Sequence, residues 1–495
     1  MKGKSLLLVT INMLFVYLSF AQDFQWAYTA SLPSRSHTVA IKESPNKHYC
    51  LAVYTDSANY RKSTLFCNNS SQQLLWSKSF SGYVTISDVE VASDNSILVV
   101  GSFKDSILVG PNWLYANPGF EEGFIVKYDE NGSFQWSNLL NPFSDSFIPT
   151  DLYIANDTLF YLTARHDGAS ASFCSFHRLN SNGVIVKSEV GGNIDVRSFS
   201  NIVTDANGNV YLSGTCGSSA VFDSLHADVN FSYQNYLVKY DSDFNAQWIL
   251  CKQYITFDDN NKLNCVGNNL YWVFDDFSNL SGDTVKILKV NFYGQILASQ
   301  NGQVPTAFFP GVAFDMDSQG NSILIEEAFV RLFITRFDSA FNVIWSDTVL
   351  TGASGFAQEI GLSCYDSCFY LSSLYYSDTL ALGNLTIMNP NTTQNSPSDL
   401  FVTRWGYPAI TSVAQIQNSN NLKIFPNPVD DKLQFNLNGE WAAYDLQIVD
   451  ISGRVVFWKQ NMADKFLHVA SLSPGLYLLK LKRNEAVFTG TFVKN

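Results

Sequence analysis

The chemically reactive side chains of this sequence are spread thinly, and their spacing supports no catalytic or metal site. None of the six histidines falls in a His-x-His or His-Glu-x-x-His pattern, so a zinc site has no support. We therefore predict no catalytic residue, no metal ligand and no cofactor, and we expect the histidines in loops or at sheet edges. The histidines are His37, His48, His166, His177, His226 and His468.

Two pairs of adjacent carboxylates, Asp275-Asp276 and Glu326-Glu327, come nearest to glycosidase chemistry. A glycosidase needs two carboxyl groups that flank the scissile bond. Adjacent residues of a strand point to opposite faces of the sheet, so neither pair is well placed for joint work. We predict that both pairs lie at a solvated edge.

Several Asp-rich turns resemble ligand-binding loops only in part. Asp129-Glu130-Asn131-Gly132 lacks the leading Ser of a sialidase Asp-box, and its Trp lies too far from the Gly. The segments 205–209 and 315–320 lack the distal bidentate Glu of a calcium-binding EF-hand. Asn and Gly readily adopt positive φ, so tight hairpin turns are the better interpretation.

The sequence contains eight cysteines, and export would expose them to oxidation. Three local pairs are plausible, although sequence alone does not give the connectivity. Buried free thiols are an equally good interpretation. The pairs are Cys50 with Cys67, Cys251 with Cys265, and Cys364 with Cys368.

A further motif consists of Asp, then Ser or Thr, then an aliphatic residue or Ala. It resembles the O-glycosylation signal of Bacteroidetes-type bacteria, and ordinary turn residues of a repeat explain it equally well. The copies begin at Asp56, Asp105, Asp157, Asp223, Asp283, Asp338, Asp347 and Asp378.

The middle of the chain repeats itself, and the repeat indicates the fold. One unit is an aromatic-rich strand, a turn and a strand that often ends in Trp, and a second unit precedes it. Repetition of Trp at one position favours packing between blades over sugar stacking. The Trp-bearing repeat is found at residues 65–76, 123–136, 176–187, 236–248, 287–298 and 332–345, with Trp76, Trp136, Trp248 and Trp345 in four copies. The repeat that precedes it is clearest at residues 201–214, with counterparts near His37, Asp88, Asp151, Leu263, Gly311 and Glu359.

The last copy of the Trp-bearing unit, residues 400–406, lacks its final strand. A matching strand, Phe24–Tyr28, stands near the N-terminus, as a ring closed by the two chain ends requires. We therefore predict an all-β fold, with a seven-bladed β-propeller of four-stranded blades over residues 22–407. Six or eight blades are the main alternatives. The pattern resembles bacterial SBBP-type β-propeller repeats, and residues 408–421 are expected to form a linker.

The N-terminus has the features of a secretory signal peptide. Lys2 and Lys4 precede an apolar run that ends near Phe20, and Ser19-Phe20-Ala21 is a small-x-small cleavage site. We expect residues 1–21 to be removed by cleavage between Ala21 and Gln22. No later segment is apolar enough to be expected to span a bilayer.

Residues 422–495 are expected to form a small, separate β-sandwich that directs the protein to its destination. The segment begins with Phe425-Pro426-Asn427-Pro428, turns at Gly453, and continues through a Leu-x-x-Gly-x-Tyr strand with Gly475 and Tyr477. These motifs resemble the type A C-terminal sorting domain of the type IX secretion system. The resemblance implies recognition by that machinery and delivery, via the periplasm, to the surface or the medium of a Bacteroidetes-type bacterium.

The net charge of −13 and the lack of a basic stripe argue against binding to nucleic acid. We expect a secreted or surface-attached, non-catalytic propeller that binds a protein or a polysaccharide. The alternative is a glycosidase or lyase acting on polysaccharide, with its site over the propeller channel. Fold alone does not separate the two, because propellers host both kinds of function.

Overall fold

In the computed structural model, the described part of the chain consists of β-strands and their connections. Every regular element in the described residues is a strand, which confirms the all-β class. The chain divides into two compact units, Met1–Ala409 and Ile410–Asn495. The described residues are 23–30, 36–56, 61–140, 145–168, 172–192, 195–228, 230, 233–253, 261–276, 284–305, 311–328, 330–352, 360–365, 368–391, 398–406, 422–436, 444–450, 455–470, 472–483 and 486–495.

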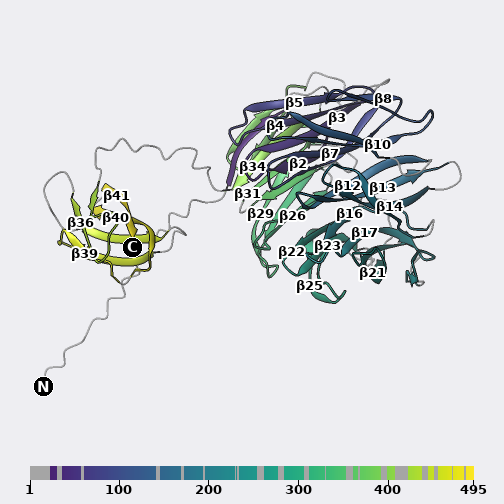
Figure 1. The fold of residues 1–495 in the computed structure, drawn as a ribbon. Helices are drawn as coiled ribbons and strands as arrows, with labels where there is room; N and C mark the ends of the chain where they lie inside the picture. The colour runs from purple at the N-terminus through teal and green to yellow at the C-terminus, as the bar shows by residue number, and fades with distance from the viewer. Residues whose placement is uncertain are drawn as a thin grey trace. The chain divides into compact units, whose positions relative to one another are not determined.

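The described strands of the first unit form seven four-stranded antiparallel sheets, numbered here in chain order (Figure 1). The first three are β2 (Ser36–Glu43), β3 (Tyr49–Asp56), β4 (Arg61–Asn68) and β5 (Leu74–Phe80); β6 (Val84–Val91), β7 (Ile97–Phe103), β10 (Glu122–Tyr128) and β11 (Phe134–Leu140); and β12 (Ser146–Asn156), β13 (Leu159–Asp167), β14 (Ser172–Asn180) and β15 (Ile185–Val190). The fourth to sixth are β16 (Asn201–Thr204), β17 (Val210–Gly217), β20 (Tyr233–Tyr240) and β21 (Ala246–Gln253); β22 (Lys262–Val266), β23 (Asn269–Asp276), β24 (Thr284–Asn291) and β25 (Ile296–Pro305); and β26 (Val312–Met316), β27 (Ser322–Ala328), β28 (Arg331–Phe337) and β29 (Val343–Leu350). The seventh is β30 (Gly361–Tyr365), β31 (Cys368–Tyr375), β34 (Asp399–Gly406) and β1 (Asp23–Thr29).

Three of these sheets carry a two-stranded hairpin between their second and third strands. The hairpins belong to the second, fourth and seventh sheets. They are β8 (Ser106–Val109) with β9 (Asn112–Tyr115), β18 (Val221–Phe222) with β19 (Leu225–His226), and β32 (Thr379–Leu382) with β33 (Leu385–Met388).

Burial is greatest in the second and third strands of the second sheet and falls toward its fourth strand, and the sequence follows this difference. All seven residues of β7 are buried, and its core is the continuous apolar run Ile97–Val100. Strand β5 instead alternates, and Leu74 on it is 56% exposed. Strands covered on both faces become uniformly apolar, whereas strands with one solvated face alternate. Each fully buried Val or Ile contributes about 1.5–3 kcal/mol.

The first strands of the sheets touch one another in order along the chain. Strand β2 touches β6, and the contacts continue through β12, β16, β22 and β26 to β30. Strand β30 in turn touches β2. The series of contacts therefore returns to its start.

The seventh sheet joins strands from opposite ends of the first unit. Phe24 of β1 is the register partner of Trp405 of β34. The Gln25 side chain donates to the carbonyl of Gly406 over 2.7 Å, and Thr403 Oγ1 donates to the carbonyl of Trp26 over 2.6 Å.

Tryptophans on the fourth strands pack on a turn of the following sheet. Trp76 Nε1 donates to the Glu130 carbonyl over 2.9 Å, and Trp248 Nε1 donates to the Phe292 carbonyl over 3.2 Å. Gly132, at φ +76°, lies beneath Trp76, where an added Cβ would come within 2.6 Å of the ring. Gly132 is therefore required for two reasons: the backbone has a positive φ, and the Trp76 ring leaves no room for a side chain. The predicted role of these tryptophans in packing is confirmed.

The second unit contains two sheets that share one hydrophobic core. The core joins Leu433 and Phe435 of one sheet to Leu446, Ile448 and Leu479 of the other. The first sheet consists of β35 (Lys423–Phe425), β36 (Lys432–Asn436) and β39 (Phe466–His468). The second consists of β38 (Val455–Met462), β37 (Tyr444–Asp450), β40 (Gly475–Arg483) and β41 (Ala486–Lys494).

Candidate functional site

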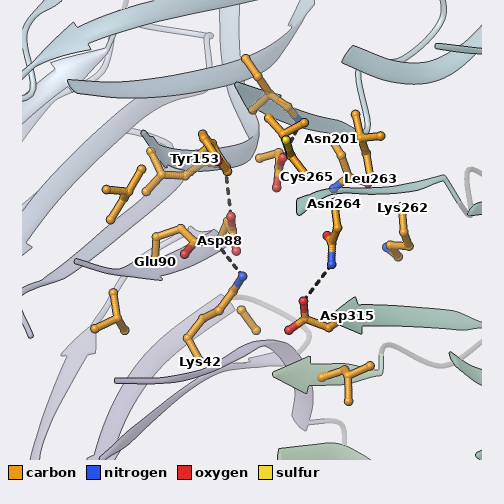
Figure 2. Close-up of a pocket in the computed structure, with 18 of the residues that line it drawn as sticks. Lys42, Asp88, Glu90, Tyr153, Asn201, Lys262, Leu263, Asn264, Cys265 and Asp315 are labelled. Atoms are coloured by element: carbon orange, nitrogen blue, oxygen red, sulfur yellow. Dashed lines mark hydrogen bonds and ion pairs between the residues drawn. The ribbon is translucent and has the colours of Figure 1, made fainter. Parts of the chain in front are cut away.

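A cavity of about 770 Å³ lies among the first strands of all seven sheets. Figure 2 shows Lys42 of β2, Asp88 and Glu90 of β6, and Asp315 of β26 pointing into it. The residues that line it include Val39–Lys42, Asp88, Glu90–Ser93, Thr150–Asp157, Ser200–Val203, Lys262–Val266, Ala313–Met316 and Ile360–Leu362.

One ion pair connects the first two sheets inside this cavity. Lys42 Nζ lies 2.6 Å from Glu90 Oε1, and the two side chains are 31% and 21% exposed. Burial raises the pKa of Glu90 to about 7, although the charge of Lys42 opposes the shift. Burial works against the charge on Lys42, but the carboxylates of Glu90 and Asp88 outweigh it and raise the pKa of the lysine. The lysine is therefore charged at neutral pH.

Three aspartates bridge from one sheet to the first strand of the next. Asp88 Oδ2 accepts from the Leu152 N–H over 3.0 Å, and Asp151 Oδ2 accepts from the Ile202 N–H over 2.8 Å. Asp315 Oδ2 accepts from the Cys364 N–H over 2.7 Å. Each carboxylate thus satisfies a backbone donor on a neighbouring sheet, a donor that would be costly to bury unpaired.

A β-bulge precedes two of these aspartates. The register shifts between Ile86 and Asp88 in β6, and between Pro149 and Asp151 in β12. A bulge bends a strand and re-aims the following side chain. Local strand geometry therefore helps to direct both carboxylates toward the next sheet.

Burial raises the pKa of every aspartate in this group. For Asp151 the charge of Asp88 adds to burial, and its pKa is raised well above the ordinary value. For Asp88 and Asp315, Lys42 works against the effect of burial. Two carboxyl groups this close favour sharing a proton over both being ionised. Among the described residues, no group of three or more His, Cys, Asp or Glu could hold a metal ion.

Sequence reasoning missed Lys42 and Glu90. It took Asp88 and Asp151 only as markers of a repeat, and Asp315 only as part of an Asp-rich turn. A usable signal was present, because Ser87-Asp88-Val89, Thr150-Asp151-Leu152 and Ser200-Asn201-Ile202 share a pattern. In all three, a small hydroxyl residue precedes Asp or Asn in the first strand of a sheet. The pattern was visible, but its meaning depends on which strand lies beside which.

The expected position of the histidines was wrong for two of them. His166 on β13 and His177 on β14 are fully buried in the third sheet. Ser175 Oγ lies 2.6 Å from Nε2 of each, and Ser188 Oγ lies 2.8 Å from Nδ1 of His177. Neutral imidazoles bonded to hydroxyl groups can be buried in a core without a charge. Burial lowers the pKa of His166 to about 4 and that of His177 to about 3.

The solvated edge expected for the adjacent carboxylates was also wrong. Asp275, Glu326 and Glu327 are buried on the second strands β23 and β27. Glu326 Oε2 accepts from the Gln303 N–H over 2.9 Å, and Asp276 pairs with Lys286 at 2.6 Å. Partners of this kind offset the cost of desolvating carboxylates at the end of an inner strand.

The Asp-rich turns are hairpin turns, as predicted. Asp129 Oδ1 accepts from the N–H groups of Asn131 and Ser133, and Asp205 Oδ1 does the same for Asn207 and Asn209. Asp317 Oδ1 makes the matching bonds in the segment 315–320.

None of the eight cysteines, all of which lie in the described part of the chain, forms a disulfide in this structure. Cys50 and Cys67 are register partners on β3 and β4, so this pair is adjacent. Cys251 and Cys265 lie on different sheets. Cys364 and Cys368 flank a hairpin, but their register partners are Phe369 and Tyr365.

The expected sorting-signal residues fall on strands and connections of the second unit. Phe425 is 48% exposed at the end of β35. Asn427 donates to the Thr491 carbonyl over 3.1 Å and accepts from the Val493 N–H over 2.8 Å, which ties this segment to β41. Tyr477 stacks on Phe492, and Gly475 begins β40. Pro426 and Pro428 flank Asn427; Gly453, Ala21 and Gln22 lie outside the described residues.

Similar solved structures are distant from this chain. The polysaccharide lyase Uly1 has 12% identity and a TM-score of 0.43, with 75% of this chain and 90% of that chain covered. Prolyl oligopeptidase B from Galerina marginata has 14% identity and a TM-score of 0.40, with 69% and 47% covered, so this chain spans about half its length. A protein of unknown function from Bacteroides caccae has 9% identity and a TM-score of 0.35, with 55% and 84% covered. No curated protein matches the sequence.

The C-terminal segment has a clear relative. Within the described residues, no helix is long and apolar enough to cross a membrane. Residues 423–495 match the family described as secretion system C-terminal sorting domain, which confirms the resemblance seen in the sequence. The second unit is thus a sorting domain of the type IX secretion system, and it implies interaction with that machinery and export to the cell surface or the medium.

Proposed function

We propose that residues 22–407 form a seven-bladed β-propeller of SBBP-like repeats, closed by β1. Support comes from the contacts of the first strands, which return from β30 to β2. The pairing of β1 with β34 gives the seventh sheet its fourth strand. Trp26 on β1 donates to the Ser70 carbonyl over 3.1 Å, in a turn of the first sheet, as Trp76 does to Glu130 in the second.

This propeller is a non-catalytic binding domain for a protein or a polysaccharide. The main observation behind the proposal is that the cavity carboxylates are engaged in hydrogen bonds and an ion pair between neighbouring sheets. Asp88, Asp151 and Asp315 accept bonds from backbone N–H groups of the next sheet, and Glu90 pairs with Lys42. A catalytic acid or base must reach a proton of the substrate. Carboxylates engaged in holding strands together are better suited to stability than to turnover.

The test is a paired measurement of binding and turnover on the mature chain. Binding to a glycan array and to proteins of the cell surface is measured alongside the release of reducing ends and of unsaturated sugars. We expect saturable binding with no product from the bound ligand. Turnover of a bound polysaccharide would refute the non-catalytic function.

The alternative function is an enzyme acting on polysaccharide, and one observation favours it. Burial raises the pKa of Glu90 to about 7, close to the value that suits a general acid or base. Asp88 and Asp151 lie beside it with raised pKa values. If this alternative holds, the wild type releases product from a bound polysaccharide, and the Glu90→Gln variant binds the same polysaccharide without releasing product. A wild type that releases no product from any polysaccharide it binds would exclude it.

Export is proposed to take place in two steps. The signal peptide of residues 1–21 directs the chain across the inner membrane, and residues 422–495 direct it out of the periplasm after the linker of residues 408–421. Deletion of residues 422–495 should leave a folded propeller trapped in the periplasm. Appearance of the deletion variant at the surface would contradict this role.

The exposed part of the sorting domain is the proposed contact for the secretion machinery. Phe425 stands out from a segment that Asn427 fixes to β41. Phe425→Ala should therefore reduce export without unfolding the domain, whereas Asn427→Ala should loosen the segment itself. Equal export of Phe425→Ala and wild type would remove Phe425 from the signal.

A further inference from the structure

The β8–β9 hairpin of the second sheet carries two aromatic rings on its solvent face. Trp113 is 55% exposed and Tyr115 is 67% exposed. Their ring centroids lie 6.4 Å apart, and the ring planes differ by 25°. Leu108, the register partner of Trp113, is 49% exposed and extends the same face. The result is a pair of exposed aromatic rings on one face of the hairpin, with ring planes within 25° of parallel.

The opposite face of this hairpin is fixed in the core. Ile107 and Val109 are buried with residues of the first and second sheets, and Leu114 packs against them. The turn at Gly110, φ +60°, lies so close to Phe134 that an added Cβ would come within 2.3 Å of its ring. The two exposed rings therefore stand on a rigid support, and binding to them costs little ordering of the chain.

The two sister hairpins show that the fold does not need outward aromatic rings. In β32–β33, Leu380 and Leu382 point inward, as Ile107 and Val109 do, while the outward positions include Thr386 and Met388. In β18–β19 the aromatic residue, Phe222, is fully buried. Inward apolar residues thus suffice for the hairpin, and Trp113 and Tyr115 are additions to it.

The chemistry of the surface points to an uncharged ligand. Residues 106–115 contain no Asp, Glu, Lys or Arg, in a chain whose net charge is −13. Asn112 Nδ2 donates to Ser137 Oγ over 3.4 Å, which ties the β9 end of the hairpin to β11. A neutral sugar offers an apolar C–H face to an aromatic ring and hydroxyl groups to polar neighbours. A charged partner would find no counter-charge on this hairpin.

We propose that Trp113 and Tyr115 form a stacking platform for consecutive residues of a neutral polysaccharide. The proposal rests on the binding function proposed above and names the ligand class and the place of contact. It differs from the recurring tryptophans, such as Trp76, whose rings are used between sheets. Exposed aromatic pairs on a rigid support are typical of recognition surfaces.

The experiment uses the full mature chain in affinity electrophoresis. The gels contain hydroxyethylcellulose, galactomannan, soluble starch or, as the charged comparison, polygalacturonate. The double variant Trp113→Ala/Tyr115→Ala is compared with wild type and with Tyr293→Ala. Tyr293 is 83% exposed on a different sheet, so it controls for loss of an exposed ring. Circular dichroism and thermal melting confirm that each variant is folded.

We expect at least one neutral polysaccharide to retard the wild type and Tyr293→Ala equally. The double variant should bind that polysaccharide about tenfold or more weakly, since two stacking contacts are lost. Equal retardation of the double variant and wild type would overturn the platform and leave the binding function standing. Retardation by polygalacturonate alone, or by no polysaccharide, would also overturn it.

Two further outcomes distinguish polysaccharide binding at the hairpin from self-association and from catalysis. A wild-type dimer that the double variant converts to monomer in sedimentation would make the hairpin a self-association surface and overturn the proposal. Product release from a retained polysaccharide would refute the non-catalytic function. In that case, weaker binding by the double variant would still support the platform.

Discussion

Two groups of titratable side chains in the first unit, one half-buried and one with fully buried histidines, respond to burial in opposite directions. The cavity group of Lys42, Asp88, Glu90, Asp151 and Asp315 connects different sheets. The His–Ser chain, defined here as His166, Ser175, His177 and Ser188, lies within the third sheet.

Desolvation disfavours the charged form in both groups, and the difference lies in which form is charged. It raises the pKa of the cavity carboxyls and lowers that of the histidines. The cavity contains a counter-ion for its carboxylates, whereas the hydrogen bonds described for the two histidines are to hydroxyl groups. Acid should therefore weaken the His–Ser chain and relieve the cavity group.

The largest expected effect is the loss of stability on acidification due to the His–Ser chain. The unfolded histidines take up protons near pH 6.5, whereas the folded ones resist until about pH 4 and 3. The contribution of the histidines to stability therefore falls as the pH drops below 6.5, by about 2 kcal/mol per histidine at pH 5. Urea unfolding at pH 7 and pH 5 measures the difference.

The double variant His166→Gln/His177→Gln should remove most of that pH dependence, whatever its stability at pH 7. His226→Gln, at an exposed position, is the control and should keep it. An unchanged pH slope in the double variant would place the acid sensitivity elsewhere.

The next effect concerns the counter-ion of the cavity. Lys42→Met leaves Glu90 and its neighbours without their cation, at a cost of about 2–3 kcal/mol at pH 7. This is below the cost of breaking a fully buried pair, because Lys42 is 31% exposed. The cost should shrink as the pH falls and the carboxyls take up protons. Denaturant midpoints at pH 7 and pH 5 give both values.

Arg165→Met is the matched control for Lys42→Met. Arg165 pairs with Asp167 at 2.9 Å, with side chains 51% and 41% exposed. Such a surface pair is worth about 0–1 kcal/mol. Equal losses in the two variants would show that the cavity pair behaves as a surface pair.

A smaller effect separates charge from hydrogen bonding at Asp151. Because its pKa is raised well above the ordinary value, Asp151→Asn keeps an acceptor for the Ile202 N–H and removes little charge. Asp151→Ala leaves that donor unpaired, at about 1–3 kcal/mol. Unfolding curves at neutral pH should rank Asn near wild type and Ala well below it. An Asn variant as unstable as the Ala variant would mean that the carboxylate is ionised and that its charge is needed.

The smallest effect lies at the end of the His–Ser chain. Ser188→Ala removes the hydroxyl 2.8 Å from His177 Nδ1, at about 1 kcal/mol. The pH slope should remain, because both histidines remain buried. A lost slope would mean that Ser188 controls their protonation.

The sequence predicts the strands well and the two titratable groups poorly. The Trp-bearing repeat and the Phe425-Pro426-Asn427-Pro428 start depend on local patterns, and both the all-β class and the sorting domain were confirmed. Lys42 and Glu90 belong to different repeat copies, so their pairing depends on which sheets are neighbours. His166 and His177 are polar residues in buried strands, an exception that composition does not reveal. The number of blades and the signal peptide stay predictions.

The seventh sheet sets the order in which the first unit is completed. Gln25 bonds to Gly406 across 381 residues of chain, so this sheet carries the largest contact separation described here. Ordering so long a loop has an entropic cost, and contacts of this kind form late in folding. The sheet gains its fourth strand only when both chain ends are present, and until then β34 has an unpaired edge. In pulsed hydrogen exchange, the amides shared by β1 and β34 should therefore be the last of the first unit to become protected, and the unit is complete only once the chain has been delivered as far as Gly406.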